Sequence, residues 1–231
     1  AGSLPQELTL WDLPGAVEYP TLRPNNVRGE LTLTWKAPAY DGNAYDSEGD
    51  HRNDEAHRTQ ISSYVIYTRK AGEAQFTQAV ELALKDLTKE GDSYVYTLKG
   101  LENGTAYTVY VGAKNGAGAS EATENAYGTA TPRCKAGPPT IGKIASGNSS
   151  ATLAFIKAPS DNGGSELLHY QVYAQEVDSE GNAGEAGPPK RQVTYVEATM
   201  EGITIPYLEN GKTYNIYVCA VNGTGEDGDS S

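Results

Sequence analysis

Cysteine is nearly absent from this 231-residue chain, which contains only Cys134 and Cys219. Two cysteines cannot build the framework of several disulfides that holds many small secreted domains together. Cys134 lies between the two halves of the chain, and Cys219 lies in a strand-like run on the side opposite its apolar residues. A disulfide between them would need Cα atoms within about 7 Å of each other. We expect two free thiols, and a single bridge is the alternative.

Positive charge is also scarce, because 18 Lys and Arg stand against 30 Asp and Glu, for a formal net charge of −12. Nucleic-acid binding needs clustered Lys and Arg to meet the phosphates, so we expect no nucleic-acid partner. Long apolar runs are missing too. A membrane-spanning helix needs roughly 18–20 consecutive apolar residues, so we expect no membrane span in this segment.

Signatures of catalysis and cofactor binding are lacking. The chain has three His residues, no Gly-x-Ser-x-Gly elbow and no Cys–His pairing. The glycines of residues 116–118 follow a strand-like run, but no helix pattern comes after them to form a phosphate-binding loop. We therefore expect no enzyme activity, no catalytic residue, no cofactor and no bound metal.

What the chain does have is an internal repeat. Residues 101–118 and residues 208–225 are identical at 11 of 18 positions, without a gap, and lie 107 residues apart. That spacing is too long for a solenoid repeat of roughly 20–50 residues and matches the size of a small domain. The chain is therefore expected to use one fold twice.

Each copy of the repeat begins with an Asn-Gly turn and continues as an alternating run. Alternation of β-branched and aromatic residues with a period of two predicts a half-buried β-strand. The residues that face one way are Tyr107, Val109, Val111 and Ala113 in the first copy, and Tyr214, Ile216, Val218 and Ala220 in the second.

The repeat resembles the E–F turn and strand F of a fibronectin type III domain. The resemblance implies that Tyr107 and Tyr214 form the tyrosine corner of that fold, in which the hydroxyl bonds back to the backbone near the turn. Other segments of the first half are similar to further strands of this family: residues 31–38 with a core Trp35 to strand B, 64–67 to strand C, 94–98 to strand E, and Thr131-Pro132 to the exit from strand G.

The second half shows the same resemblance with one departure. Residues 138–139 are similar to the start of strand A, residues 151–155 to strand B, and residues 168–173 to strand C. Phe155 stands where a Trp is usual, and one extra residue precedes the proline that follows strand B. The extra residue indicates a bulge or, alternatively, pairing through Ile156. The fold class implied is all-β, with two immunoglobulin-like (fibronectin type III) β-sandwiches in tandem.

We expect the first domain to span residues 1–132, with an N-terminal extension and a long B–C loop, and the second to span 133–231. Only six residues follow Gly225, so strand G of the second domain is expected to be short or missing. A missing strand would leave the edge of strand F unpaired. Residues 8–11 of a neighbouring molecule, Leu-Thr-Leu-Trp, are a candidate to fill such an edge.

The long acidic loop of the first half holds the best metal candidates, Asp46, Glu48 and Asp50. Oxygens at alternating positions suit a hard cation such as calcium. However, His51 stands where an EF-hand loop needs Gly, and His57 stands where it needs the bidentate Glu. A solvated acidic loop is the expectation, with a calcium site as the alternative. Zinc at the two His residues is less favoured, because no Cys lies nearby.

Two outward aromatics, Tyr110 and Tyr217, occupy equivalent positions of the repeat. They could stack on a sugar ring or anchor a protein partner. The interpretation that we favour is cross-strand pairing within the sheet. Asn103, Asn148 and Asn222 lie in glycosylation sequons, although the first also has a complete explanation as a turn residue.

The resemblance implies a non-catalytic extracellular spacer or adhesion module of a larger secreted or cell-surface protein, monomeric by itself. Such a module mediates protein interaction or positions other domains, so the expected partner is a protein or a glycan. The alternative function is a carbohydrate-binding accessory module of a polysaccharide-degrading enzyme.

Overall fold

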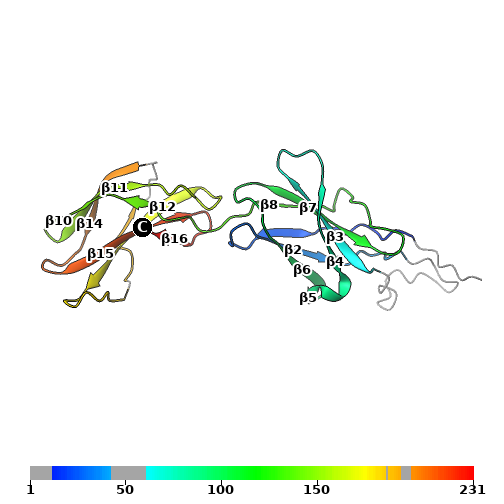
Figure 1. Cartoon of the computed structure of the whole chain (residues 1–231), viewed down its shortest axis with the longest axis horizontal. Helices are drawn as coiled ribbons and strands as arrows, with labels where there is room; N and C mark the ends of the chain where they lie inside the picture. Colours follow the sequence, from blue (N-terminus) through cyan, green and yellow to red (C-terminus); the bar gives the residue numbers. More distant parts are fainter. Residues whose placement is uncertain (1–11, 43–60, 186, 194–198) are drawn as a thin grey trace, which may run out of the picture. The chain divides into compact units, whose positions relative to one another are not determined.

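The computed structural model describes residues 12–42, 61–185, 187–193 and 199–231. The chain divides into two compact units, and each contains two antiparallel sheets (Figure 1). The all-β prediction is confirmed. The elements are β1 (Thr21–Pro24), β2 (Leu31–Lys36), β3 (Ser63–Lys70), β4 (Thr77–Ala83), a 3-10 turn η3 (Leu84–Asp86), β5 (Thr88–Glu90), β6 (Ser93–Leu98), β7 (Tyr107–Lys114), β8 (Gly128–Ala130), β9 (Thr140–Ile141), β10 (Ile144–Gly147), β11 (Ser150–Lys157), β12 (Leu167–Val177), β13 (Arg191–Val193), β14 (Thr199–Pro206), β15 (Thr213–Asn222) and β16 (Asp227–Ser230).

The first sandwich packs a sheet of order β1-β2-β6-β5 against a sheet of order β4-β3-β7-β8. Its core is aromatic. Trp35 of β2 is only 2% exposed, and its ring meets Tyr64 of β3 edge-on at 5.4 Å and stacks with Tyr94 of β6 at 5.7 Å. The predicted core position of Trp35 is therefore confirmed, and the three rings join the two sheets.

The second sandwich pairs β11 with β14 on one side and with β9 and β10 on the other, and packs this sheet against one of order β13-β12-β15-β16. Ile156, and not Phe155, takes the fully buried place in β11. The β11–β14 register continues from Leu153 through Ile156 without a shift. The extra residue is therefore accommodated by pairing through Ile156, the second of the two alternatives.

The repeated segments form β7 and β15, and the first asparagine of each repeat fixes the start of the strand. Asn103 Oδ1 accepts a hydrogen bond from Gly29 N–H at 2.8 Å, and Asn210 Oδ1 accepts one from Ser149 N–H at 2.9 Å. In the second domain, Glu209 N–H also donates to the Tyr214 hydroxyl at 3.1 Å. This bond confirms the tyrosine corner predicted for Tyr214.

The second asparagine of each repeat fixes the other end of the strand. Asn115 Nδ2 donates to the backbone carbonyls of Asp12 at 2.7 Å and Asp41 at 3.1 Å, and its Oδ1 accepts Ala117 N–H at 2.9 Å. One side chain thus holds the segment that leads into the domain, the B–C loop and the turn after strand F. We call this arrangement the asparagine tie.

Asn222 makes the same tie in the second domain. It is 0% exposed, and its Nδ2 donates to Cys134 O at 2.8 Å and Asn162 O at 2.7 Å. Its Oδ1 accepts from Thr224 N–H at 3.1 Å. Both amide ends are engaged, so the folded domain offers no free amide for glycosylation at the Asn222 sequon.

Glycine is required beside each tie. Gly42 and Gly163 both have positive φ, at 89° and 73°. A Cβ atom would lie 2.2 Å from Asp12 O at the first and 2.1 Å from Cys134 O at the second. Only glycine lets the B–C loop approach the leading segment closely enough for the asparagine to bridge them.

The structure shows which of the two expectations for the last strand holds. The tail contains β16, which pairs with β15 at Cys219 and Val221. Val218 O also accepts Ser231 N–H at 3.0 Å. Strand G of the second domain is therefore short but present, and the edge of β15 is paired over this stretch.

The asparagine tie predicts a large loss of stability on truncation. Asn222→Ala leaves the buried carbonyl of Cys134 and the part-buried carbonyl of Asn162 without their donor, and an unsatisfied buried group costs about 1–3 kcal/mol. We expect the melting temperature of the second domain to fall by roughly 10 °C or more in calorimetry. Asn125→Ala is the control, since Asn125 is exposed, and it should change stability by at most about 0.5 kcal/mol. Equal melting temperatures for Asn222→Ala and the wild type would contradict the role of the tie.

Candidate functional site

The residues first considered for metal binding, Asp46, Glu48, Asp50, His51 and His57, lie outside the described residues. Among the residues that the structure does describe, no group of three His, Cys, Asp or Glu side chains is placed to hold a metal ion. The described part of the chain also contains no helix that is long and apolar enough to cross a membrane.

Both cysteines are free and buried. Although Cys219 lies on the outer face of β15, it is enclosed beside β16, and burial raises the pKa of its thiol, with a further contribution from Asp227. A raised pKa leaves little thiolate at neutral pH, so this thiol is a poor nucleophile.

Tyr110 and Tyr217 pair across strands, as the favoured interpretation held. Tyr110 of β7 lies opposite Tyr67 of β3, with ring centroids 4.5 Å apart and planes 9° apart. Tyr217 of β15 lies opposite Tyr173 of β12 at 5.0 Å and 7°. The same stacked pair therefore stands on the outer face of the strand C–strand F ladder in each domain.

Among the residues that the structure describes, the first domain extends its pair into a larger group and the second does not. Phe76, just before β4, meets Tyr110 edge-on at 5.0 Å and stacks with Tyr127 at 5.6 Å. Tyr127, just before β8, also meets Tyr110 edge-on at 6.0 Å and is 44% exposed. We call Tyr67, Phe76, Tyr110 and Tyr127 the outer aromatic cluster, which draws one ring from the vicinity of each strand of the β4-β3-β7-β8 sheet.

Charged groups border the outer aromatic cluster. The Arg69 guanidinium lies 4.7 Å from the centre of the Phe76 ring, a cation–π distance. Burial raises the pKa of Tyr110, and Tyr67, Tyr127 and Glu121 add to the shift. The phenol of Tyr110 therefore stays neutral over the physiological range, and the cluster presents apolar rings beside one cation.

The second domain surrounds its tyrosine pair with polar groups instead. The Tyr173 hydroxyl is hydrogen-bonded with Gln171 Oε1 at 2.9 Å and with the Asp227 carboxylate of β16. Burial, followed by the bond with Asp227, raises the pKa of Tyr173. This pair therefore helps to hold β16 in place, and no further ring of the described residues contacts it.

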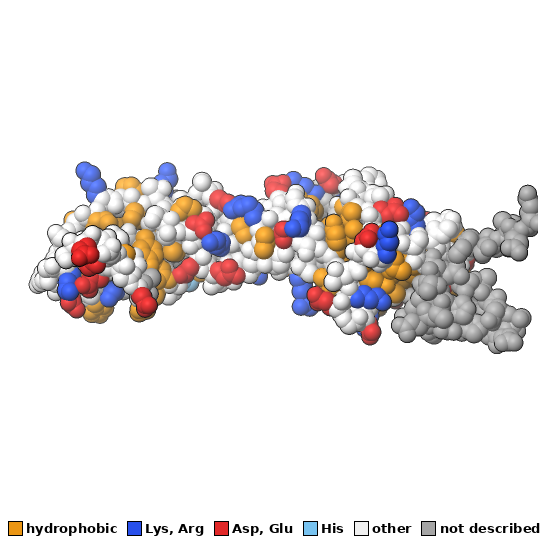
Figure 2. All heavy atoms as spheres, turned by 60° about the horizontal axis from the view of Figure 1, so that its bottom comes forward, with side chains coloured by type: hydrophobic (Ala, Val, Ile, Leu, Met, Phe, Trp, Pro, Cys, Tyr) orange, Lys and Arg blue, Asp and Glu red, His pale blue; other side chains and the backbone are white. Residues whose placement is uncertain are grey.

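Sequence reasoning singled out Tyr110 and Tyr217 but missed the other members of the cluster, Phe76 and Tyr127. Both stand just outside strands, so the period-two pattern does not mark them. The only available signal is that Phe76 is one of two Phe residues in a chain with 16 Tyr. Acidic and basic side chains are interspersed with apolar patches on the face that Figure 2 shows, so that face carries no continuous basic stripe.

The raised pKa of Tyr173 predicts a loss of stability at alkaline pH. The phenol is neutral in both states below about pH 10, the ordinary tyrosine pKa, so its contribution is complete there. Above that pH the unfolded state loses its proton first, and stability falls as pH rises through the folded pKa. In urea unfolding, Tyr173→Phe should lower stability at neutral pH by about 0.5–1.5 kcal/mol and make the decline above pH 10 less steep.

Asp227→Asn is the matched variant for this effect, because it keeps a hydrogen-bonding partner for Tyr173 and removes the negative charge. It should also make the alkaline decline less steep. If the free energy of unfolding falls equally steeply above about pH 10 in Tyr173→Phe and in the wild type, Tyr173 does not cause the loss of stability.

Comparison with known proteins places this geometry in a family. The Fibronectin type III domain family matches residues 53–129 and residues 137–231. Among solved structures, the FN1-FN3 domains of chicken CNTN1 match at 17% sequence identity with a TM-score of 0.48, over 95% of this chain and 64% of that chain. The two matched ranges span well over half of the sequence, and the chain therefore belongs to the fibronectin type III family, with two domains in tandem.

Proposed function

We propose that the chain is a non-catalytic interaction module of a larger extracellular or cell-surface protein, and that the outer aromatic cluster is its contact with a protein partner. Tandem fibronectin type III domains are typical of extracellular adhesion and spacer proteins and are generally non-catalytic. The proposal keeps the domain division at 1–132 and 133–231, a monomeric chain and a solvated acidic loop without a cofactor.

The observation that carries the proposal is the difference between two otherwise equivalent outer faces. Both domains keep the stacked tyrosine pair, which has a structural purpose in the sheet. Among the described residues, the first domain adds Phe76, Tyr127 and the adjacent Arg69, and the second domain has no such additions. Aromatic residues and arginine are the types most enriched among the residues that dominate the binding energy of protein interfaces.

Glycan binding through Tyr110 and Tyr217 is the second candidate, and the ring geometry gives it less support. A sugar stacks on a free aromatic face, but one face of each ring is covered by its cross-strand partner. Tyr127 lies at the exposed margin of the outer aromatic cluster, and it is the ring of the cluster that supports glycan binding.

A bead-adhesion experiment separates these functions. Beads coated with the full chain are tested on surfaces that carry extracellular-matrix proteins or polysaccharides. We expect adhesion to a protein surface, and we expect the double variant Phe76→Ala with Tyr127→Ala to reduce it by at least about tenfold, because truncated hot-spot residues cost 2 kcal/mol or more. Both side chains lie outside the buried core, so the variant should remain folded.

Tyr207→Ala is the matched control, because Tyr207 is an exposed aromatic outside the outer aromatic cluster. It should adhere like the wild type. Adhesion to polysaccharide alone, with loss in the double variant, would favour the glycan-binding alternative. If the double variant adheres as strongly as the wild type, the outer aromatic cluster is not the contact with the partner.

A further inference from the structure

A row of polar side chains borders the outer aromatic cluster on the same face of the sheet. Side chains two residues apart along a strand point to the same face. Arg69 of β3 therefore shares the face of Tyr67, and Thr108 of β7 shares the face of Tyr110. Arg69 lies opposite Thr108, and Thr108 lies opposite Thr129 of β8. One arginine and two hydroxyls thus cross three neighbouring strands beside the rings.

The hydroxyls of this row keep hydrogen-bonding capacity for a ligand. Thr129 Oγ1 donates to Thr108 Oγ1 at 3.3 Å. The Thr108 hydroxyl acts as the acceptor in this bond, so its own hydrogen remains available for another acceptor. Thr108 is half-buried and Thr129 is exposed, and a ligand on this face of the sheet can therefore reach both.

Arg69 has no carboxylate partner among the residues that the structure describes. Its guanidinium lies 4.7 Å from the centre of the Phe76 ring, and such a contact holds the group in place while its N–H groups can still donate. Lys114, a cation on the same face, is bonded to Glu81 at 2.9 Å. The chain has 30 acidic and 18 basic residues, so a shortage of carboxylates does not explain the free charge of Arg69.

The equivalent positions of the second domain carry no charge. Gln175, two residues after the stacked tyrosine of β12, takes the place of Arg69, and Asn215 opposite it takes the place of Thr108. The side-chain amide of Gln175 donates to the backbone carbonyl of Gly184. The polar row beside the tyrosine pair is therefore neutral and internally bonded in one copy of the fold, and charged in the other.

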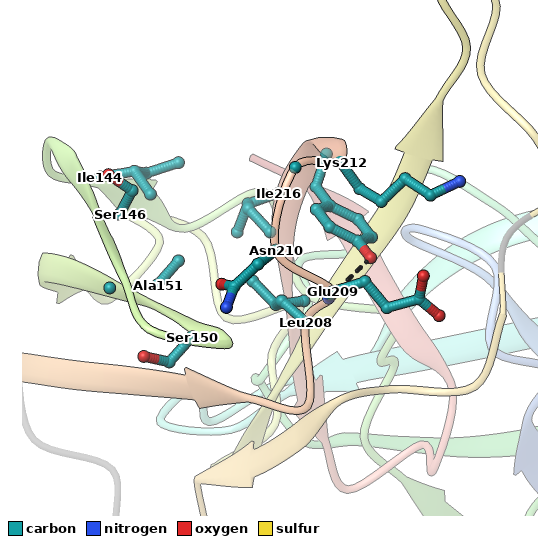
Figure 3. Close-up of a pocket in the computed structure, with 12 residues that line it drawn as sticks. Ile144, Ser146, Ser150, Ala151, Leu208, Glu209, Asn210, Lys212 and Ile216 are labelled. Atoms are coloured by element: carbon teal, nitrogen blue, oxygen red, sulfur yellow. Dashed lines mark hydrogen bonds between the residues drawn. The ribbon is translucent and has the colours of Figure 1, made fainter.

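A cation also stands near an aromatic ring in the second domain, where Lys212 and Tyr214 line one hollow (Figure 3). There the polar groups are already used by the chain itself. The Lys212 ammonium is bonded to Glu176 at 2.7 Å, and the Tyr214 hydroxyl accepts the N–H of Glu209. This hollow therefore offers no free cation to a ligand, whereas the polar row of the first domain offers Arg69.

The available groups fit a ligand with a single negative charge. The planar fork of an arginine binds one carboxylate through two parallel hydrogen bonds, and the Thr108 hydroxyl adds a third donor. A polyanionic chain would need several clustered cations. On this face Lys114 is already paired, and Glu121 adds to the pKa of Tyr110, which burial raises first. One carboxylate therefore suits this face better than a row of sulfates or uronates.

We propose that Arg69 and Thr108 bind a side-chain carboxylate of the partner protein, and that the outer aromatic cluster receives the apolar side chain next to it in the partner's sequence. This inference rests on the proposed function and adds the chemistry of the partner, a segment in which an acidic residue stands beside an aromatic or aliphatic one. The rings keep water from one side of the ion pair and so strengthen it relative to an isolated surface pair. The rings supply contact area, and the carboxylate supplies specificity.

The test selects peptides from a random-peptide phage library on the immobilised full chain and removes those that also bind the Arg69→Gln variant. We expect the remaining sequences to share an acidic residue next to an aromatic or aliphatic one. One of them is then synthesised with both ends capped, together with a copy in which the amide residue replaces the acidic one. The wild-type chain should bind the acidic peptide at least about threefold more tightly than its amide copy, because only the carboxylate forms a charge-assisted pair with the guanidinium.

Variants of the chain, each checked for an unchanged melting temperature, separate the contributions in double-mutant cycles with the two peptides. Arg69→Gln should bind both peptides equally, and Arg69→Lys should keep part of the difference, since lysine retains the charge and not the planar fork. Thr108→Val should weaken binding of the acidic peptide by about threefold. Arg23→Gln is the matched control, because it removes the same charge from β1 in the other sheet of the sandwich, and it should leave the preference unchanged.

Three results would overturn the proposal. The first is that no peptide remains after subtraction on Arg69→Gln; a sulfated polysaccharide that binds the wild type and not this variant would then assign the cation to a glycan. The second is equal affinity of the wild type for the acidic peptide and its amide copy. The third is unchanged binding of the acidic peptide to the double variant Phe76→Ala with Tyr127→Ala, because the carboxylate would then bind without the rings.

The two proposals can fail separately. Bead adhesion of the double variant measures the rings of the outer aromatic cluster and needs no knowledge of Arg69. If the double variant loses adhesion and Arg69→Gln adheres like the wild type, the proposed function stands and the carboxylate contact is wrong. If adhesion ignores the double variant, the proposed function fails, and the peptide cycles at Arg69 still decide whether the polar row binds a carboxylate.

Discussion

The asparagine that ends strand F is the interaction on which each sandwich depends. A loop that crosses the end of a β-sandwich carries backbone carbonyls with no ladder partner, and leaving them buried without a donor is costly. Asn115 and Asn222 solve this problem with one amide that reaches the leading segment and the B–C loop together. A serine or an aspartate could not supply two donors at once. The close approach that the amide needs also explains why Gly42 and Gly163 occupy the loop.

The alternation and the Asn-Gly turn of the repeat predicted β7 and β15, and the resemblance to fibronectin type III domains implied the fold class and the tyrosine corner at Tyr214. Trp35 also occupied its expected place, since a large aromatic at an inward position has few other sites. The asparagine tie could not be foreseen, because its acceptors are backbone atoms far away in the sequence. For the same reason the sequence marks Asn222 as part of a glycosylation sequon but does not show that its side chain is buried. The sequence left open whether strand G of the second domain is short or missing, because a polar tail such as residues 226–231 carries no hydrophobic period.

The sequence predicted only part of the outer aromatic cluster. Tyr110 could be found from the repeat, but Phe76 and Tyr127 reach it from segments next to strands, where sheet geometry and not sequence period sets the neighbours. The equivalent tyrosine pair in the second domain is bound to Asp227 and so contributes to the fold. Duplication has kept the stacked pair and the ties and has changed what surrounds the pair. Difference between copies is therefore a better guide to binding than the identities that first revealed the duplication.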